Sequence, residues 1–93
     1  MNIAALATVL DDVLAHLRCS IEEGWAQHRP TPAIVAEVEA LRGRIGAGDP
    51  DALPLLHILF APTGTLQEIS IANGWGHEYI ALASSFDGAA GRS

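Results

Sequence analysis

The sequence predicts an all-α fold, arranged as a compact single domain of four to five helices. Apolar residues recur at steps of three and four along most of the chain, which is the spacing that gives an α-helix one apolar face. Pro and Gly residues separate these stretches where helices would begin and end. A chain of 93 residues, 49% of them hydrophobic, can bury one modest core. We therefore expect one domain over residues 1–88 and a flexible tail over 89–93.

Two long helices are predicted in the first half of the chain. The first covers residues 3–23 and is ended by Gly24, after which Trp25 closes over the end of the core. The second begins at Thr31, because threonine can cap free amides and Pro32 has no amide to leave unpaired in a first turn. A glycine-rich turn ends this second helix. The apolar stripe of the first helix consists of Ile3, Leu6, Leu10, Val13, Leu17 and Ile21.

A third helix is predicted after residues 49–51. We expect it to begin at Ala52 with Asp51 as its cap, because Pro54 is tolerated only within a first turn. Apolar residues follow one another almost without interruption over residues 53–60. A helix that is apolar on most of its sides is usually buried on most of them, so this helix is predicted to be the central one.

The next segment begins with Thr65 and Glu68, which have the spacing of a capping box. In that motif each side chain satisfies a backbone amide of the other residue. Residues 66–72 permit a strand as well as a helix, but a lone strand has no partner in this chain. A short helix is therefore the preferred prediction.

A turn at residues 73–76 leads into the last predicted helix, over 77–87, which Gly88 ends. The helical spacing directs five of its apolar residues toward the core: Tyr79, Ile80, Leu82, Ala83 and Phe86.

The segment over residues 55–87 carries a series of short motifs. They are Leu59-Phe60, Thr63-Gly64-Thr65-Leu66-Gln67-Glu68, Asn73-Gly74-Trp75 and Phe86-Asp87. In this order they resemble a group of small bacterial helical domains of unknown function. The resemblance covers about a third of the chain and implies a compact helical fold of bacterial origin. Some small acidic domains of this kind look like immunity proteins encoded beside toxins, although no residue role transfers from the resemblance.

The charge of the chain limits its partners. Five arginines, no lysine and eleven acidic residues give a formal net charge of −6 at pH 7. This balance excludes a general nucleic-acid binder, which needs clustered cations to displace counterions from phosphates. Asp11 and Asp12 interrupt the first apolar run, so we expect no signal peptide, no membrane segment and a cytoplasmic location.

The sequence offers little support for catalysis or for a metal or other cofactor. The closest pair of potential metal ligands is His16 and Cys19, and this spacing is more typical of an ordinary helix flank than of a zinc site. The single cysteine excludes a disulfide framework. Ser84 lies on the same predicted helix as His77 and Asp87, but a catalytic triad seldom lies along one helix. We therefore predict a protein that is not an enzyme and carries no cofactor.

The 62–79 segment departs most from a plain helical bundle and supplies the candidate binding residues. Trp75 lies between two glycines, either as an exposed anchor for a partner or as an indole that closes the core. The candidate partner-binding residues are Glu68, Asn73, Trp75 and Tyr79. They predict a non-catalytic acidic module, such as an antitoxin or immunity-type protein, that binds a basic protein. The alternatives are a self-associating helical domain, with a homodimer as its simplest form, and a small-ligand-binding domain.

Overall fold

The computed structural model describes residues 2–20, 25–26, 29–61 and 64–91, and it confirms a small all-α domain. Side chains are described over 2–20, 31–61 and 64–91. The elements, in chain order, are α1 (Ile3–Arg18), β1 (Trp25–Ala26), β2 (Arg29–Pro30), α2 (Thr31–Gly46), a 3₁₀ turn η1 (Pro50–Ala52), α3 (Leu53–Leu59), α4 (Thr65–Ala72) and α5 (Gly76–Ala90).

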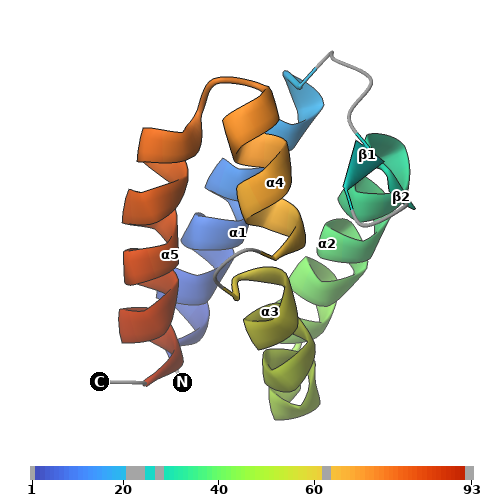
Figure 1. Ribbon diagram of the computed structural model, residues 1–93. Coiled ribbons are helices and arrows are strands. Elements are labelled where there is room, and N and C mark those ends of the chain that lie inside the picture. The colour runs from blue at the N-terminus through green and yellow to red at the C-terminus, as the bar shows by residue number, and fades with distance from the viewer. Residues whose placement is uncertain (1, 21–24, 27–28, 62–63, 92–93) are drawn as a thin grey trace.

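Helix α1 is the central element. It lies between α2 and α5 and packs against both (Figure 1). Asn2 begins the helix, because its side-chain oxygen accepts a hydrogen bond from the amide of Ala5 at 3.0 Å. The buried face of α1 consists of Leu6, Val9, Leu10, Val13, Leu14 and Leu17. This agrees with the predicted stripe from Leu6 to Leu17, whereas Ile3 at its start is exposed.

The end of α1 differs from the prediction of a helix over residues 3–23. The helix ends at Arg18, and the amide of Ser20 bonds to the carbonyl of Leu17, which is the tighter spacing of a 3₁₀ turn. The Ser20 hydroxyl also donates to the carbonyl of His16 at 2.9 Å. These two contacts use carbonyls at the end of α1. The expected end at Gly24 lies outside the described residues.

Helix α2 has the predicted bounds, from Thr31 to a glycine-rich end at Gly46. A two-residue antiparallel pairing precedes it, in which Trp25 is opposite Pro30 and Ala26 is opposite Arg29. The predicted position of the Trp25 indole over the core lies outside the described side chains.

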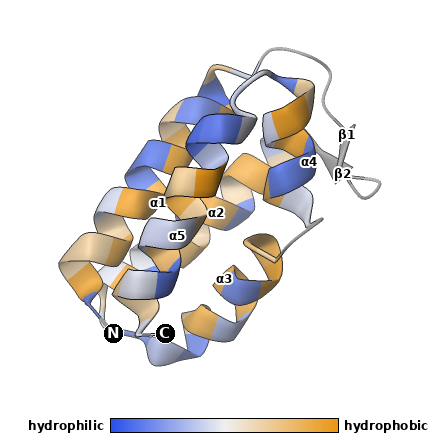
Figure 2. Cartoon of the chain, turned by 60° about the vertical axis from the view of Figure 1, so that its left-hand side comes forward, coloured by the Kyte–Doolittle hydropathy of each residue, from blue (hydrophilic) through white to orange (hydrophobic). Residues whose placement is uncertain are grey.

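The prediction that the third helix is the central, buried one is wrong. Asp49 accepts a hydrogen bond from the amide of Asp51 and caps η1, so Asp51 is not the cap and α3 begins only at Leu53. A helix of seven residues can bury only one side against a small core. Ile58 and Leu55 are therefore 68% and 41% exposed. Figure 2 shows that α3 is mostly hydrophobic and yet lies at the edge of the molecule.

The segment over residues 65–72 is helical, as preferred, but it does not begin with the predicted capping box. Gly64 precedes the first helical residue, and no side chain caps this end. Thr65 is inside the helix and buried, whereas Glu68 is exposed. A Cβ on Gly64 would lie 2.8 Å from the carbonyl oxygen of Ala61. This close approach between α3 and α4 requires glycine, and it moves the start of the helix away from the capping-box register.

Helix α5 is longer than predicted at both ends. It continues past Gly88 to Ala90, and Gly91 ends it with a φ of 89°. Ala89 is buried, and its carbonyl accepts a hydrogen bond from the amide of Asn2 at 2.8 Å. Residues 89–90 thus belong to the domain rather than to a flexible tail, and the ends of the described chain lie close together (Figure 1).

Candidate functional site

The turn between α4 and α5 is a Schellman motif that contains two of the predicted site residues. Asn73 ends α4, Gly74 takes a φ of 83°, and the amide of Trp75 donates to the carbonyl of Ser70 at 2.9 Å. Glycine adopts the left-handed conformation that this turn needs without steric cost. The Asn73 side chain donates to the carbonyl of Ile69 at 3.0 Å. Asn73 therefore contributes to the end of α4.

The turn directs Trp75 into the core, so the interpretation of this residue as an exposed anchor is wrong. Its side chain is only 6% exposed. The indole Nε1 donates to Ser20 Oγ at 3.1 Å, and the ring centroid lies 4.8 Å from that of His16. The alternative interpretation, an indole that closes the end of the core, is confirmed.

Tyr79 is also part of the core, at 5% exposed. Its hydroxyl donates to the carbonyl of Phe60 at 3.1 Å and thereby ties α5 to the end of α3. The Tyr79 ring lies nearly parallel to the ring of Phe60. Phe60 in turn stacks on Phe86, with ring centroids 4.3 Å apart. Burial, and to a smaller extent the carboxylate of Asp87, raises the pKa of Tyr79 to about 12. The phenol is therefore a neutral hydrogen-bond donor inside the domain, and it does not offer a contact for a partner at the surface.

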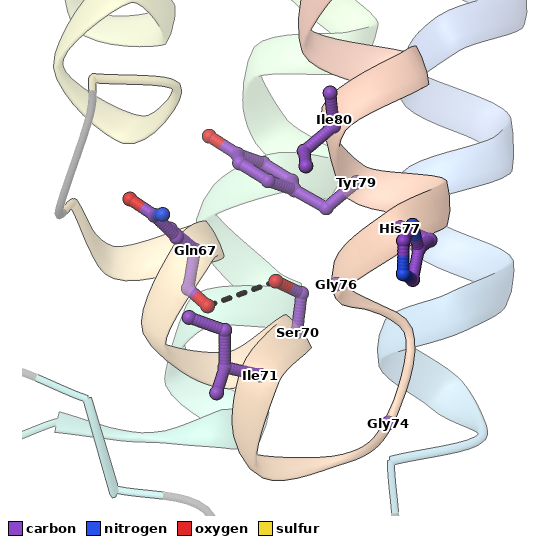
Figure 3. A pocket seen from close by; sticks show the side chains of 8 residues that line it. All are labelled: Gln67, Ser70, Ile71, Gly74, Gly76, His77, Tyr79 and Ile80. Carbon is purple, nitrogen blue, oxygen red and sulfur yellow. Dashed lines mark hydrogen bonds between the residues drawn. The ribbon is translucent and has the colours of Figure 1, made fainter.

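A groove beside these residues follows α5 and is formed by two adjacent cavities, the first between α5 and α4 and the second between α5 and the end of α3. The first, of about 390 Å³, is lined by Gln67, Ser70, Ile71, Gly74, Gly76, His77, Tyr79 and Ile80. The second, of about 420 Å³, is lined by His57, Phe60, Ala61, Gln67, Tyr79, Ile80, Ala83 and Asp87. Because three residues line both cavities, we treat them as one feature and call it the α4–α5 groove. Figure 3 shows the first cavity, with Gln67 from α4 and Tyr79 from α5 on either side of it.

Two isoleucines give the groove an apolar rim. Ile71 on α4 is 65% exposed, and Ile80 on α5 is 66% exposed. The sequence placed Ile80 in reach of the core, and the structure places it on the surface instead. Full burial of an isoleucine side chain is favourable by about 1.5–3 kcal/mol relative to leaving it in water. Two of them at one groove indicate a surface suited to an apolar partner group.

The arginines with described side chains are confined to the first half of the chain. Among the described side chains, the three arginines all lie on α1 or α2, and each forms an ion pair: Arg18 with Glu39, Arg42 with Asp11 and Arg44 with Asp49. No arginine or lysine occurs anywhere from residue 45 to residue 91.

The acidic residues of α4 and α5 therefore have no arginine or lysine on their own helices with which to pair. Glu68, Glu78 and Asp87 are all exposed, and none of them forms an ion pair with a described side chain. Asp87 lines the α4–α5 groove itself. Glu68, a predicted site residue, lies one helical turn from Ile71 on α4. The groove thus combines apolar and acidic groups with no arginine or lysine from its own helices.

The residues considered for metal binding or nucleophilic catalysis are exposed or half-buried, and they do not converge on one site within the described parts of the chain. Cys19 is exposed just after α1, and the ring of His16 packs against Trp75 at an interplanar angle of 33°. Ser84 is exposed on α5. Within the described parts of the chain, no group of three or more His, Cys, Asp or Glu side chains could hold a metal ion. The described helices include none that is long and apolar enough to cross a membrane.

The sequence reasoning selected a part of the chain that lines the groove, but two of its four candidate side chains are buried. It selected the aromatic residues, Trp75 and Tyr79, and missed Ile71, Ile80 and Asp87. The signal that could have found the groove is the distribution of charge: all cations before residue 92 occur in the first 44 residues. Net charge alone does not show that separation.

No protein-family model, curated protein or solved structure matches the chain.

Proposed function

We propose that the protein is a non-catalytic binding module that engages a basic protein partner through the side of the molecule formed by α4 and α5. The observation that carries this proposal is the absence of arginine and lysine from residues 45–91, which include α4 and α5. Each of the three arginines with a described side chain is neutralised by a carboxylate on α1, α2 or the turn that follows α2, while Glu68, Glu78 and Asp87 face solvent without such a cation. Unpaired charge of one sign attracts a partner of the opposite sign and accelerates its association.

An antitoxin or immunity-type protein is the concrete form of this proposal. Such a protein would neutralise a basic partner by covering part of its surface. A module of this kind needs an acidic, partly apolar surface, and the α4–α5 groove supplies exposed isoleucines and the carboxylate of Asp87.

The experiment is affinity capture from a lysate of the source organism on the immobilised full chain, followed by identification and purification of the bound protein. Titration calorimetry at low and high salt then measures its affinity. A basic partner whose Kd increases with salt supports the proposal, because ions screen exposed charges within about 10 Å at 0.1 M. A neutral or acidic partner, or an affinity that does not change with salt, contradicts it.

A further inference from the structure

The α4–α5 groove has a defined length and direction. Gly76, Ile80, Ala83 and Asp87 follow one another at steps of three and four along α5, so they share one side of that helix. At 1.5 Å per residue, the distance from Gly76 to Asp87 along the helix axis is about 16 Å, or about three helical turns. The groove therefore accommodates an elongated segment.

The two ends of the groove differ in chemistry. At the end formed by the first cavity, Ile71 and Ile80 are exposed. The hydroxyls there are already used inside the domain, because Ser70 Oγ donates to the carbonyl of Gln67 at 2.8 Å (Figure 3) and Tyr79 donates to Phe60. The other end carries the carboxylate of Asp87. An aliphatic group fits the first end and a cationic group fits the second.

A helical segment suits these walls better than an extended one. The walls are formed mainly by helices, α4 and α5 at the first cavity and α5 with the end of α3 at the second, and helical backbone groups bond within each helix. They offer no strand edge on which an extended peptide could replace the hydrogen bonds it makes to water. A helix satisfies its own backbone and presents only side chains to the groove.

A second copy of this chain is a poor occupant of the same groove. In a twofold dimer each copy presents the same surface to the other. Asp87 and Glu68 of one copy would then approach the same carboxylates of the other, and α4 and α5 contain no arginine or lysine to compensate. Repulsion between like charges opposes that arrangement.

We infer that the α4–α5 groove binds a basic amphipathic helix of the partner, with an aliphatic side chain between Ile71 and Ile80 and an arginine or lysine at Asp87. This inference rests on the proposed function, and it specifies the site and the form of the bound segment.

The test uses the isotope-labelled full chain and a synthetic amphipathic peptide of about 14 residues, long enough to span the groove. The peptide carries leucines on one face and arginines two turns further along that face, because Ile80 and Asp87 are about 10 Å apart along α5. A second peptide has glutamate in place of each arginine. We expect the basic peptide to shift the amide resonances of Ile71, Gly76, Ile80 and Asp87. Its Kd should be at least about tenfold lower than that of the acidic peptide, the factor that corresponds to about 1.4 kcal/mol.

The chain offers matched variants for both parts of the site. Ile80→Gln should raise the Kd of the basic peptide about tenfold, whereas Ile58→Gln should leave it unchanged. Ile58 is exposed to the same extent, at 68% against 66%, and lines neither cavity. Asp87→Asn should weaken binding, and Asp12→Asn, an exposed change on α1, should not. Both isoleucines are on the surface, so neither variant is expected to unfold the chain.

Resonance shifts confined to α1 and α2, equal affinity for both peptides, or no shift with either peptide at millimolar concentration would overturn the inference. These outcomes are separate from a failure of the proposed function. If the captured basic partner binds with the expected salt dependence but Ile80→Gln does not weaken it, the proposed function holds and the groove is the wrong site. If the partner is not basic, the proposed function itself fails.

Discussion

The indole of Trp75 donates a 3.1 Å hydrogen bond to the hydroxyl of Ser20, a residue 55 positions earlier in the chain. Ser20 in turn donates to the carbonyl of His16, whose ring lies against the indole. The start of α5 is thus joined to the end of α1 by one aromatic side chain. This contact closes one end of the core, between the two helices that contribute much of it.

Trp75→Ala should therefore destabilise the fold by about 3–5 kcal/mol, the usual cost of removing a large buried aromatic side chain. The measurement is urea denaturation followed by circular dichroism at pH 7. Ser20→Ala is the matched variant, since it removes the hydrogen-bond acceptor and leaves the ring, and it should cost about 1 kcal/mol. An unchanged urea midpoint for Trp75→Ala would show that the indole is exposed, as one interpretation of the sequence had it.

The hydroxyl of Tyr79 gives a second prediction, at alkaline pH. Tyr79 is the only tyrosine of the chain, so phenolate absorbance reports this residue alone. Burial raises its pKa to about 12 in the folded state, compared with about 10 when the chain is unfolded. The folded state holds the phenol proton more tightly than the unfolded chain does. The contribution of this phenol to the free energy of unfolding is therefore complete below pH 10, and it decreases as the pH rises from about 10 to about 12. We expect the absorbance midpoint near pH 12 in buffer and near pH 10 in urea.

Tyr79→Phe is the control for that titration. The variant loses the hydrogen bond to the carbonyl of Phe60, which should cost about 1 kcal/mol at neutral pH. It should also lose the part of the alkaline destabilisation that comes from this phenol. A folded-state midpoint near pH 10 for the unmodified chain would place Tyr79 in solvent and contradict the described packing.

A third prediction concerns the close approach of α3 and α4. Gly64→Ala should destabilise the chain by roughly 2 kcal/mol, because the new Cβ would lie 2.8 Å from the carbonyl oxygen of Ala61 and 3.2 Å from that of Ile58. Gly43→Ala is the matched control: no atom lies within 4 Å of a Cβ there, and it lies inside α2. It should stabilise the chain by about 0.5–1 kcal/mol, since alanine favours a helix more than glycine does. Thermal unfolding of the two variants should shift the midpoint in opposite directions.

The sequence was sufficient to predict the two helices whose apolar spacing is long and regular. Thr31 and the glycines near residue 46 define α2 correctly, and the stripe from Leu6 to Leu17 defines the buried face of α1. Both depend on local spacing and on the residues that begin and end a helix. How deeply each helix is buried depends instead on how helices far apart in the sequence pack together. Helix α3 is almost continuously apolar in sequence and yet lies at the edge, because a helix of seven residues that begins with Leu53 and Pro54 packs less extensively against other helices than α1 does.

The groove could not be derived from spacing for a related reason. Ile80 and Tyr79 are adjacent in sequence and both suit a core, yet Tyr79 is buried and Ile80 is exposed. Which of them turns inward is decided by the position of α5 against α1 and by the hydrogen bond to Phe60. Neither contact is visible before the fold is known. The separation of cations from the second half of the chain was visible, and it marks the side of the molecule on which the groove lies.

A fourth prediction concerns the acid side of the stability profile. Asp49 accepts hydrogen bonds from Arg44 Nε and from the amide of Asp51, both at 2.9 Å. The arginine, and then the amide, lower the pKa of this carboxyl below its usual range. The folded state therefore binds a proton at Asp49 less readily than the unfolded chain does. The stability that results is present above the unfolded pKa, near pH 4, and is lost as the pH falls through the lower folded value.

Asp49→Asn tests this contribution. Asparagine keeps a side-chain oxygen that can accept from the amide of Asp51 and so can still cap the turn. It loses the negative charge and, with it, the second oxygen that accepts from Arg44 Nε. We expect the variant to have a lower urea midpoint than the parent chain at pH 6, and the two midpoints to converge as the pH falls from 4 toward 2. Asp12→Asn, which changes a carboxylate that forms none of the described ion pairs, should show no such convergence. A constant difference between Asp49→Asn and the parent at every pH would mean that the carboxylate at residue 49 acts through its shape rather than through its charge.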